Sequence, residues 1–303
     1  MAALVLGGCA APLQSERLTA TAFPEPIELT AVPFFPQEEY QCGPAALATA
    51  LAWTGLAVTP LELAPQVYLP EQRGSLQLEL LAAARRHGRV PYVLRPELAA
   101  LFAELAAGYP VLVLQNLALS WYPKWHYAVV VGADVARDEI VLRSGRERRH
   151  VVPLAVFERT WRRADYWAMV VTPPTRVPRT AEETTYLQAV VALERLQRWD
   201  ETAAAYGASL ARWPHSLAAH LGLGNSRYAL GDLTGAEQAY RAAAAAHADA
   251  GAAFNNLAQT LADQQRWREA EEAARRAVAL GGAYLEIYRA TLADILARRS
   301  GRR

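Results

Sequence analysis

The sequence predicts two domains, an α+β domain followed by an all-α domain of short repeats. Three prolines in a short polar stretch, near residues 173–178, are typical of a linker. Before this stretch, β-type and helical patterns are mixed, and after it the chain is alanine-rich and helical to its end. The second half also repeats at a fixed spacing. We therefore divide the chain into a signal remnant and tether at 1–27, an α+β domain at 28–172, a linker at 173–182 and repeats at 183–303.

The length and charge of the chain limit its class. At 303 residues it suits two domains. Lys plus Arg is 31 and Asp plus Glu is 30, so there is no electrostatic case for nucleic acid or an acidic partner. The arginines at 143–149 and 298–303 are interpreted as solvated faces or tails. No stretch after the N-terminus approaches the roughly 20 apolar residues of a membrane span.

The N-terminus contains a candidate lipidation site. The run Leu6–Cys9 resembles a bacterial lipobox, in which the cysteine becomes the lipidated first residue. The apolar segment is short and no Lys or Arg precedes it, so either the true start lies upstream or the match is by chance. We favour the first, because a polar, proline-containing tether at 12–26 follows. The prediction is a lipid-anchored protein of the cell envelope that faces the periplasm at the outer membrane and meets the membrane by its anchor only. An ordinary, small hydrophobic Cys9 is the alternative.

Cys42 is the candidate nucleophile. It ends an irregular polar stretch, and a strong helix pattern starts at once, with Gly43 permitting a close approach and Pro44 suited to the first turn. A thiolate at a helix N-terminus is stabilised by unpaired N–H groups, so we expect a lowered pKa. A buried structural cysteine is the alternative. The only other cysteine is Cys9, and neither has histidines at zinc spacing, so no metal or other cofactor is expected.

The pattern in the rest of the first domain predicts an α+β fold. Helices are expected at 60–67, 75–87, 97–107 and 153–162, and strands at 90–94, 110–115, 126–132, 138–143 and 165–172.

His126 is the candidate base, by elimination. It stands at the first position of a strand, behind a loop of aromatic residues, where a polar side chain can face a cleft. His87 ends a helix beside arginines, His150 lies in a basic run, and the other histidines belong to the repeats. A surface histidine at a strand end is the alternative.

Two segments resemble a known family. Gln37-x3-Gln-Cys42-Gly-Pro-Ala-Ala-Leu and His126-Tyr-Ala-Val-Val-Val-Gly are similar to the bacteriocin-processing, double-glycine type cysteine peptidases and their stand-alone lipoprotein relatives, over about residues 30–172. The resemblance implies a papain-like cysteine peptidase fold, a Cys42–His126 pair, an acidic or amide residue that orients the histidine, and a glutamine in the oxyanion hole. The family's glutamine is usually six residues before the cysteine. Gln37 lies five before, and with the Cys42 backbone N–H it would hold the oxyanion.

The third catalytic member departs from the family. The family has an Asp-Pro pair at the end of the strand after the histidine strand, where this chain has Leu142-Arg-Ser144-Gly145. A hairpin tip near residues 135 and 136 places His126 across from Gly145 and near Ser144, so the family position maps onto Ser144. A hydroxyl stabilises an imidazolium less than a carboxylate does, so low or absent activity stays open.

The second domain resembles tetratricopeptide repeats. Residue types recur at 34-residue steps, as in Thr202, Ala236 and Ala270, and in Tyr206, Tyr240 and Ala274. Leu223-Gly224 falls at the Leu-Gly position of that pattern. Three repeats are predicted at 183–216, 217–250 and 251–283, followed by a capping helix at 283–299. Such repeats bind peptide segments and do no chemistry.

Three functions follow from these residues. The first is a cysteine peptidase that cleaves a peptide or protein substrate, with repeats that bind this substrate or a protein partner. The second is a weak or inactive peptidase-like adaptor that binds peptides. The third is acyl transfer by the same acyl-enzyme, which the sequence does not separate from hydrolysis.

Overall fold

The computed structural model describes residues 12–18, 23, 25–37 and 41–301. They form two compact units. The first comprises the chain up to Ala84 with Pro91–Val171 and Pro178–Thr180, and the second comprises Arg85–Val90, Thr172–Val177 and the chain from Ala181 onward.

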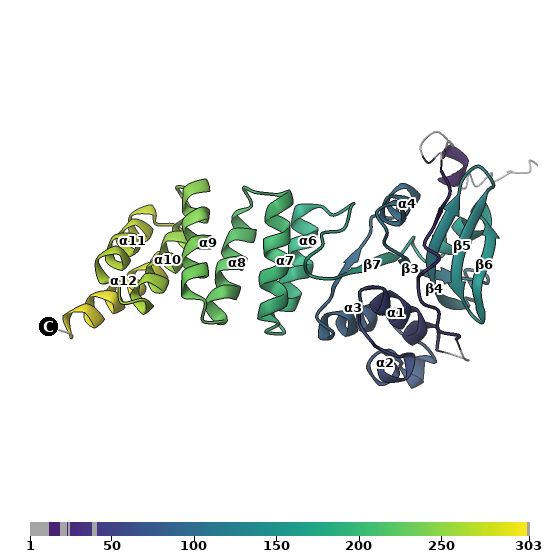
Figure 1. Cartoon of the computed structure of the whole chain (residues 1–303), viewed down its shortest axis with the longest axis horizontal. Helices are drawn as coiled ribbons and strands as arrows, with labels where there is room; N and C mark the ends of the chain where they lie inside the picture. The colour runs from purple at the N-terminus through teal and green to yellow at the C-terminus, as the bar shows by residue number, and fades with distance from the viewer. Residues whose placement is uncertain (1–11, 19–22, 24, 38–40, 302–303) are drawn as a thin grey trace, which may run out of the picture. The chain divides into compact units, whose positions relative to one another are not determined.

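The first unit is built on a sheet whose described strands run in the order β2-β7-β3-β4-β5-β6, with β1 paired to β4 (Figure 1). The strands are β1 (Ile27–Glu28), β2 (Val90–Val93), β3 (Val111–Asn116), β4 (Trp125–Asp134), β5 (Glu139–Ser144), β6 (Glu147–Pro153) and β7 (Ala168–Thr172). The β3–β4, β4–β5 and β5–β6 pairs are antiparallel. Because β4 and β5 are antiparallel neighbours, the start of β4 lies beside the end of β5.

The helices of the first unit are α1 (Cys42–Trp53), α2 (Pro60–Val67), α3 (Gln77–Arg86), α4 (Leu98–Ala106) and α5 (Leu154–Arg162), with short 3-10 turns η1 (Ser15–Arg17) and η2 (Pro70–Gln72). Of these, α1, α4 and α5 pack against the sheet, and α2 packs against α1. Leucines of α1, α2 and α3 share one buried cluster with alternate residues of β4, namely Tyr127, Val129 and Val131. Side chains alternate along a strand, so this face of β4 is the one that holds α1 in place.

The longer elements of the first unit agree with the sequence prediction, with the exception of the polar strand β6. The expected helices and strands are present with small shifts at their ends. Two strands, β1 and β6, were not predicted. β6 is rich in arginine and mostly exposed, because it lies at the edge of the sheet and needs no apolar alternation.

Arg143 corrects the interpretation of the 143–149 run as a solvated face. Its side chain is only 4% exposed. The guanidinium donates to the carbonyl oxygens of Val32 (3.3 Å), Thr30 (3.0 Å) and Arg148 (2.5 Å). Burial lowers the pKa of this group. Arg143 can be buried because backbone oxygens satisfy its donors, and it ties the chain before Gln37 to the strand that ends in Ser144.

The described start of the predicted tether, residues 12–18, contacts the first domain. Gln14 and Ser15 donate their backbone N–H groups to the buried Glu158 carboxylate at 2.6 and 2.7 Å. The Gln14 side chain bonds the Pro96 oxygen and the Leu98 N–H. These contacts hold residues 12–18 on the domain. No helix in the described part of the chain has the length and hydropathy needed to cross a bilayer.

The second unit consists of paired helices (Figure 1). They are α6 (Glu183–Glu194), α7 (Trp199–Arg212), α8 (Leu217–Ala229), α9 (Leu233–Ala246), α10 (Gly251–Asp263), α11 (Trp267–Leu280) and α12 (Leu285–Ser300). Each of the first three pairs lies within the bounds of one predicted repeat, and α12 lies where the capping helix is predicted. A Cβ on Gly224 would lie 2.4 Å from the Tyr240 ring, which explains why a small residue and an aromatic recur together.

Candidate active site

Cys42 begins α1, as the sequence predicts, but its thiol is not acidic. The sulfur is half-buried and packs against the main core cluster. Burial raises the pKa of the thiol, while the backbone N–H groups of Tyr127, Gly43 and Cys42 act in the opposite direction. The expectation of a lowered pKa is therefore wrong, because desolvation outweighs the donors at the helix start. The Tyr127 contact places the thiol beside the peptide unit that joins His126 to Tyr127.

Position 43 requires glycine because Ser75 lies too close to its backbone for any side chain. A Cβ at this position would lie 2.3 Å from Oγ and 2.6 Å from Cβ of Ser75. The Ser75 carbonyl oxygen accepts a hydrogen bond from the Tyr127 hydroxyl at 3.1 Å. Ser75 therefore links the start of α1 to β4. Neither Ser75 nor Tyr127 stood out in the sequence, because their roles arise only when α1 packs on the sheet.

Gly43→Ala is expected to displace Cys42. The added methyl group must push aside Ser75, which costs about 1–3 kcal/mol in a packed region. We expect a lower melting temperature and slower alkylation of Cys42, measured by mass spectrometry. Adding Ser75→Gly should restore both values, because it removes both clashing atoms. The single Ser75→Gly variant is the control, and a double variant as impaired as Gly43→Ala would contradict this explanation.

His126 and Ser144 are in direct contact. His126 Nε2 lies 2.8 Å from Ser144 Oγ. Asp134 pairs with Glu139, so the hairpin tip lies about one residue further along than predicted, and a register shift follows between Val130 and Gly132. The register then pairs Val129 with Arg143, which places Ser144 on the same face as His126. With Nε2 bonded to Ser144, Nδ1 is the nitrogen left to exchange a proton with a thiol.

The environment of His126 favours the neutral imidazole. Burial lowers its pKa to about 4, and the positive charges of Lys124 and His150 act in the same direction. The resting site therefore holds a neutral thiol and a neutral imidazole. His150 was assigned to a basic run in the sequence, but β6 brings it opposite Leu142 and close to the site. Its own Nδ1 lies 3.0 Å from the Glu147 carboxylate.

Gln37 bridges the two strands that carry His126 and Ser144. Its backbone N–H donates to the Gly145 oxygen at 2.8 Å, and its Oε1 accepts the Gly145 N–H at 3.1 Å. Its Nε2 donates to the Tyr127 oxygen at 3.2 Å. One amide hydrogen remains for another acceptor. The structure thus places Gln37 beside the site, with a positioning contact that the sequence did not indicate.

Cys9 lies outside the described residues. In the described ranges, no group of three or more His, Cys, Asp and Glu side chains is arranged to hold a metal ion. The four predicted catalytic residues all lie around the start of α1, the start of β4 and the end of β5.

Comparisons with family models match both halves of the chain. Residues 29–169 match the Peptidase_C39 like family, and residues 187–253 and 222–284 match the tetratricopeptide repeat. The chain therefore contains a Peptidase_C39-like domain and tetratricopeptide repeats, which confirms the predicted fold class. A search of curated proteins finds no match.

Two solved structures are similar to the first half of the chain. One is a C39-like peptidase from Bacillus anthracis, with 18% identity and a TM-score of 0.43, covering 52% of this chain and 100% of that chain. The other is the peptidase domain of Streptococcus ComA, a bifunctional ABC transporter involved in quorum sensing. It shows 19% identity and a TM-score of 0.39, covering 47% of this chain and 98% of that chain.

Proposed function

We propose that this chain, which carries a Peptidase_C39-like domain and tetratricopeptide repeats, is a cysteine peptidase with Cys42 as nucleophile and His126 as base. The observation that carries the proposal is the 2.8 Å contact of His126 with Ser144 at the strand start where the Cys42 thiol packs. A nucleophile, a base and a group that orients the base are the parts that covalent catalysis requires.

In the proposed reaction, Cys42 sulfur attacks the carbonyl carbon of a peptide bond while its proton moves to His126 Nδ1. The carbonyl oxygen becomes an oxyanion that accepts hydrogen bonds from the Cys42 backbone N–H and the second amide hydrogen of Gln37. The C–N bond then breaks, and His126 gives its proton to the leaving amine. Water, deprotonated by His126, attacks the thioester and releases the acid and the thiol. Attack by an amine in place of water would give acyl transfer.

A neutral resting pair requires that His126 act as a general base during the attack, because no thiolate is formed beforehand. A preformed thiolate–imidazolium pair requires a low thiol pKa and a high imidazole pKa, and burial drives both groups the other way. Proton transfer therefore accompanies the attack. Ser144 orients the imidazole in this scheme but offers no negative charge to the cation that forms.

A second candidate function is a peptide-binding adaptor without catalysis. The same two observations favour it, namely a hydroxyl where the family resemblance implies an acid, and an imidazole that resists protonation. The fold and repeats would then serve binding alone.

Peptide hydrolysis separates the two functions. The purified full chain is incubated with a peptide mixture from a digested proteome, and new termini are identified by mass spectrometry. The peptidase predicts new termini that are absent with Cys42→Ala and His126→Ala. Termini that persist in Cys42→Ala would contradict the assignment of the nucleophile. Peptides that bind the wild type and Cys42→Ala equally, without cleavage by either, would favour the adaptor.

We further propose that Cys9 is lipidated and that the repeats bind the substrate or a partner protein. The lipobox-like run before Cys9 and the match to tetratricopeptide repeats support these two statements. With a complete signal sequence, the full chain should partition into detergent, and Cys9→Ala should release it. Aqueous behaviour of both forms would exclude the anchor.

A further inference from the structure

Exposed apolar side chains gather in the β3–β4 connection, directly before His126. Trp121 is 81% exposed and Tyr122 is 72% exposed, and their ring centroids lie 6.2 Å apart. Leu117, Leu119 and Trp125 are exposed as well. We call residues 117–125 the aromatic loop. Contiguous exposed apolar side chains of this kind mark interaction surfaces.

The exposed rings do not hold this loop in shape. The buried Asn116 does so, because its Oδ1 accepts the N–H groups of Ala118 (3.0 Å) and Lys124 (2.9 Å). Its Nδ2 donates to the Leu119 oxygen at 3.3 Å. Hydrogen bonds between the Asn116 side chain and the backbone of the loop therefore fix the loop, and the rings face solvent. The exposed Trp121 and Tyr122 rings are therefore not needed to stabilise the fold.

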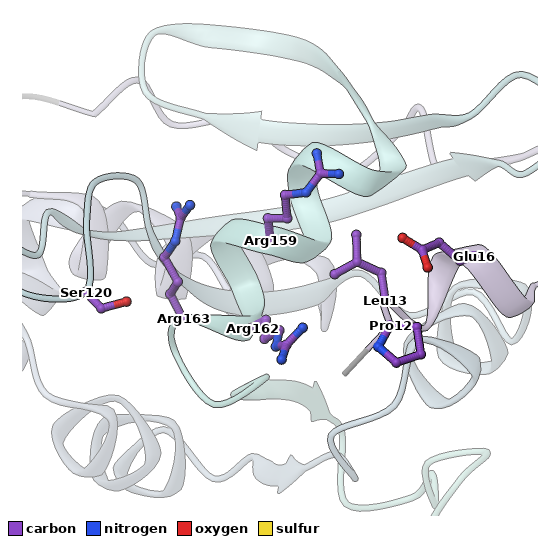
Figure 2. Close-up of a pocket in the computed structure, with 7 residues that line it drawn as sticks. All are labelled: Pro12, Leu13, Glu16, Ser120, Arg159, Arg162 and Arg163. Atoms are coloured by element: carbon purple, nitrogen blue, oxygen red, sulfur yellow. The ribbon is translucent and has the colours of Figure 1, made fainter. Parts of the chain in front are cut away.

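A basic pocket adjoins the aromatic loop. It has a volume of about 630 Å³ and is lined by Arg159, Arg162 and Arg163, with Ser120, Pro12, Leu13 and Glu16 completing it. Figure 2 shows Arg159 and Arg162 on α5 and Arg163 directly after it, with Ser120 on one side and the N-terminal segment on the other. Arg163 donates to the Asn116 oxygen at 3.3 Å, so the arginine pocket and the aromatic loop are continuous. Within the described ranges, Arg159 and Arg163 form no ion pair with a carboxylate.

The chain enters the domain at this same pocket. Leu13 is buried, and Glu158 holds the backbone N–H groups of the next two residues, so the position of Pro12 is fixed. Cys9 precedes Pro12 by three residues, which span at most about 10 Å. An anchor at Cys9 would therefore hold the arginine pocket and the aromatic loop close to the membrane surface.

We propose that the aromatic loop and the arginine pocket form a surface that docks on a bilayer containing anionic lipids. Trp and Tyr side chains favour the membrane–water interface, and arginines attract anionic head groups. The orientation of this surface towards the bilayer rests on the proposed lipidation of Cys9. The sequence predicts a membrane contact through the lipid anchor only, and this surface would be a second contact. A peptide is the other possible occupant, and the bilayer is favoured because the chain enters the domain here. Substrates would then be cleaved beside the membrane.

Vesicle binding by the full chain with Cys9→Ser tests the surface without the anchor. The probes are vesicles of phosphatidylcholine alone or with phosphatidylglycerol, and bound protein is measured by cosedimentation. We expect binding only to the anionic vesicles, weakened by salt. Each arginine near the surface is worth about fivefold in affinity, so Arg159→Gln with Arg163→Gln should weaken binding about 25-fold. The control is Arg146→Gln with Arg148→Gln, which removes one exposed arginine from the β5–β6 turn and one from β6.

The aromatic loop has its own test. Trp121→Ala with Tyr122→Ala should weaken vesicle binding at least tenfold, while Leu61→Ala with Leu78→Ala, which removes two exposed leucines elsewhere, should not. Equal binding to neutral and anionic vesicles, or equal losses in the test and control variants, would overturn the proposal. So would loop-dependent binding of peptides from a random library without vesicle binding. Cys42 alkylation, followed in parallel, reports the proposed catalytic site separately, so either proposal can fail alone.

Discussion

Ser144→Asp is expected to raise the pKa of His126 and to increase Cys42-dependent activity at least about tenfold. The Ser144 hydroxyl already lies 2.8 Å from His126 Nε2. A carboxylate at such a distance raises a histidine pKa by roughly one to three units, from its present value of about 4. The same charge stabilises the imidazolium that forms when Cys42 loses its proton, which is why activity should rise.

Ser144→Asn is the matched control for this substitution. It has nearly the shape of Asp and can bond the imidazole, but it carries no charge. The pKa of His126 can be read from the pH dependence of its ring resonances by NMR, which does not require activity. Equal pKa values in the Asp and Asn variants would show that position 144 does not govern the charge on His126.

Acidification is expected to destabilise the first unit through His126. The pKa is about 4 in the folded protein and 6.5 for an unperturbed histidine. Between these values the unfolded chain binds more protons, so stability falls as pH drops below 6.5 and the loss is complete near pH 4. The loss is about 3 kcal/mol, because each pKa unit corresponds to about 1.4 kcal/mol.

His126→Gln isolates this contribution from the other groups that titrate. Glutamine can still hydrogen-bond Ser144 but takes up no proton in this range. Urea unfolding followed by tryptophan fluorescence, at about pH 7 and about pH 4, should show a smaller loss of stability in the variant. The same loss in both proteins would mean that His126 is not buried as a neutral group.

Local signals made most of the fold predictable. The repeats follow from a 34-residue step, and α1 follows from a polar stretch that ends at Cys42 before an alanine-rich helix. β6 and the burial of Arg143 were missed, because they depend on an edge position and on backbone carbonyls from distant segments. Periodicity does not report such contacts.

The positions of the candidate residues were predictable, but their electrostatics were not. Cys42 and His126 lie at element boundaries that the sequence marks, and the hairpin brought Ser144 to His126 despite a shift in register. The pKa of the thiol was predicted in the wrong direction, because a helix start is visible in a sequence whereas desolvation by a core is not. Ser75, Tyr127 and His150 join the site only through packing and strand pairing.

The most direct test of the central claim, that His126 is the base for Cys42, is the pH profile of Cys42 alkylation by iodoacetamide. Modification is mapped to Cys42 by mass spectrometry in the wild type and in His126→Ala. We predict that near pH 7 the wild type reacts about a hundredfold faster, the size of general-base assistance. We also predict that this advantage disappears as pH falls through about 4, where His126 becomes protonated. Equal rates in the two proteins across the profile would contradict the claim and leave a peptide-binding domain without catalysis.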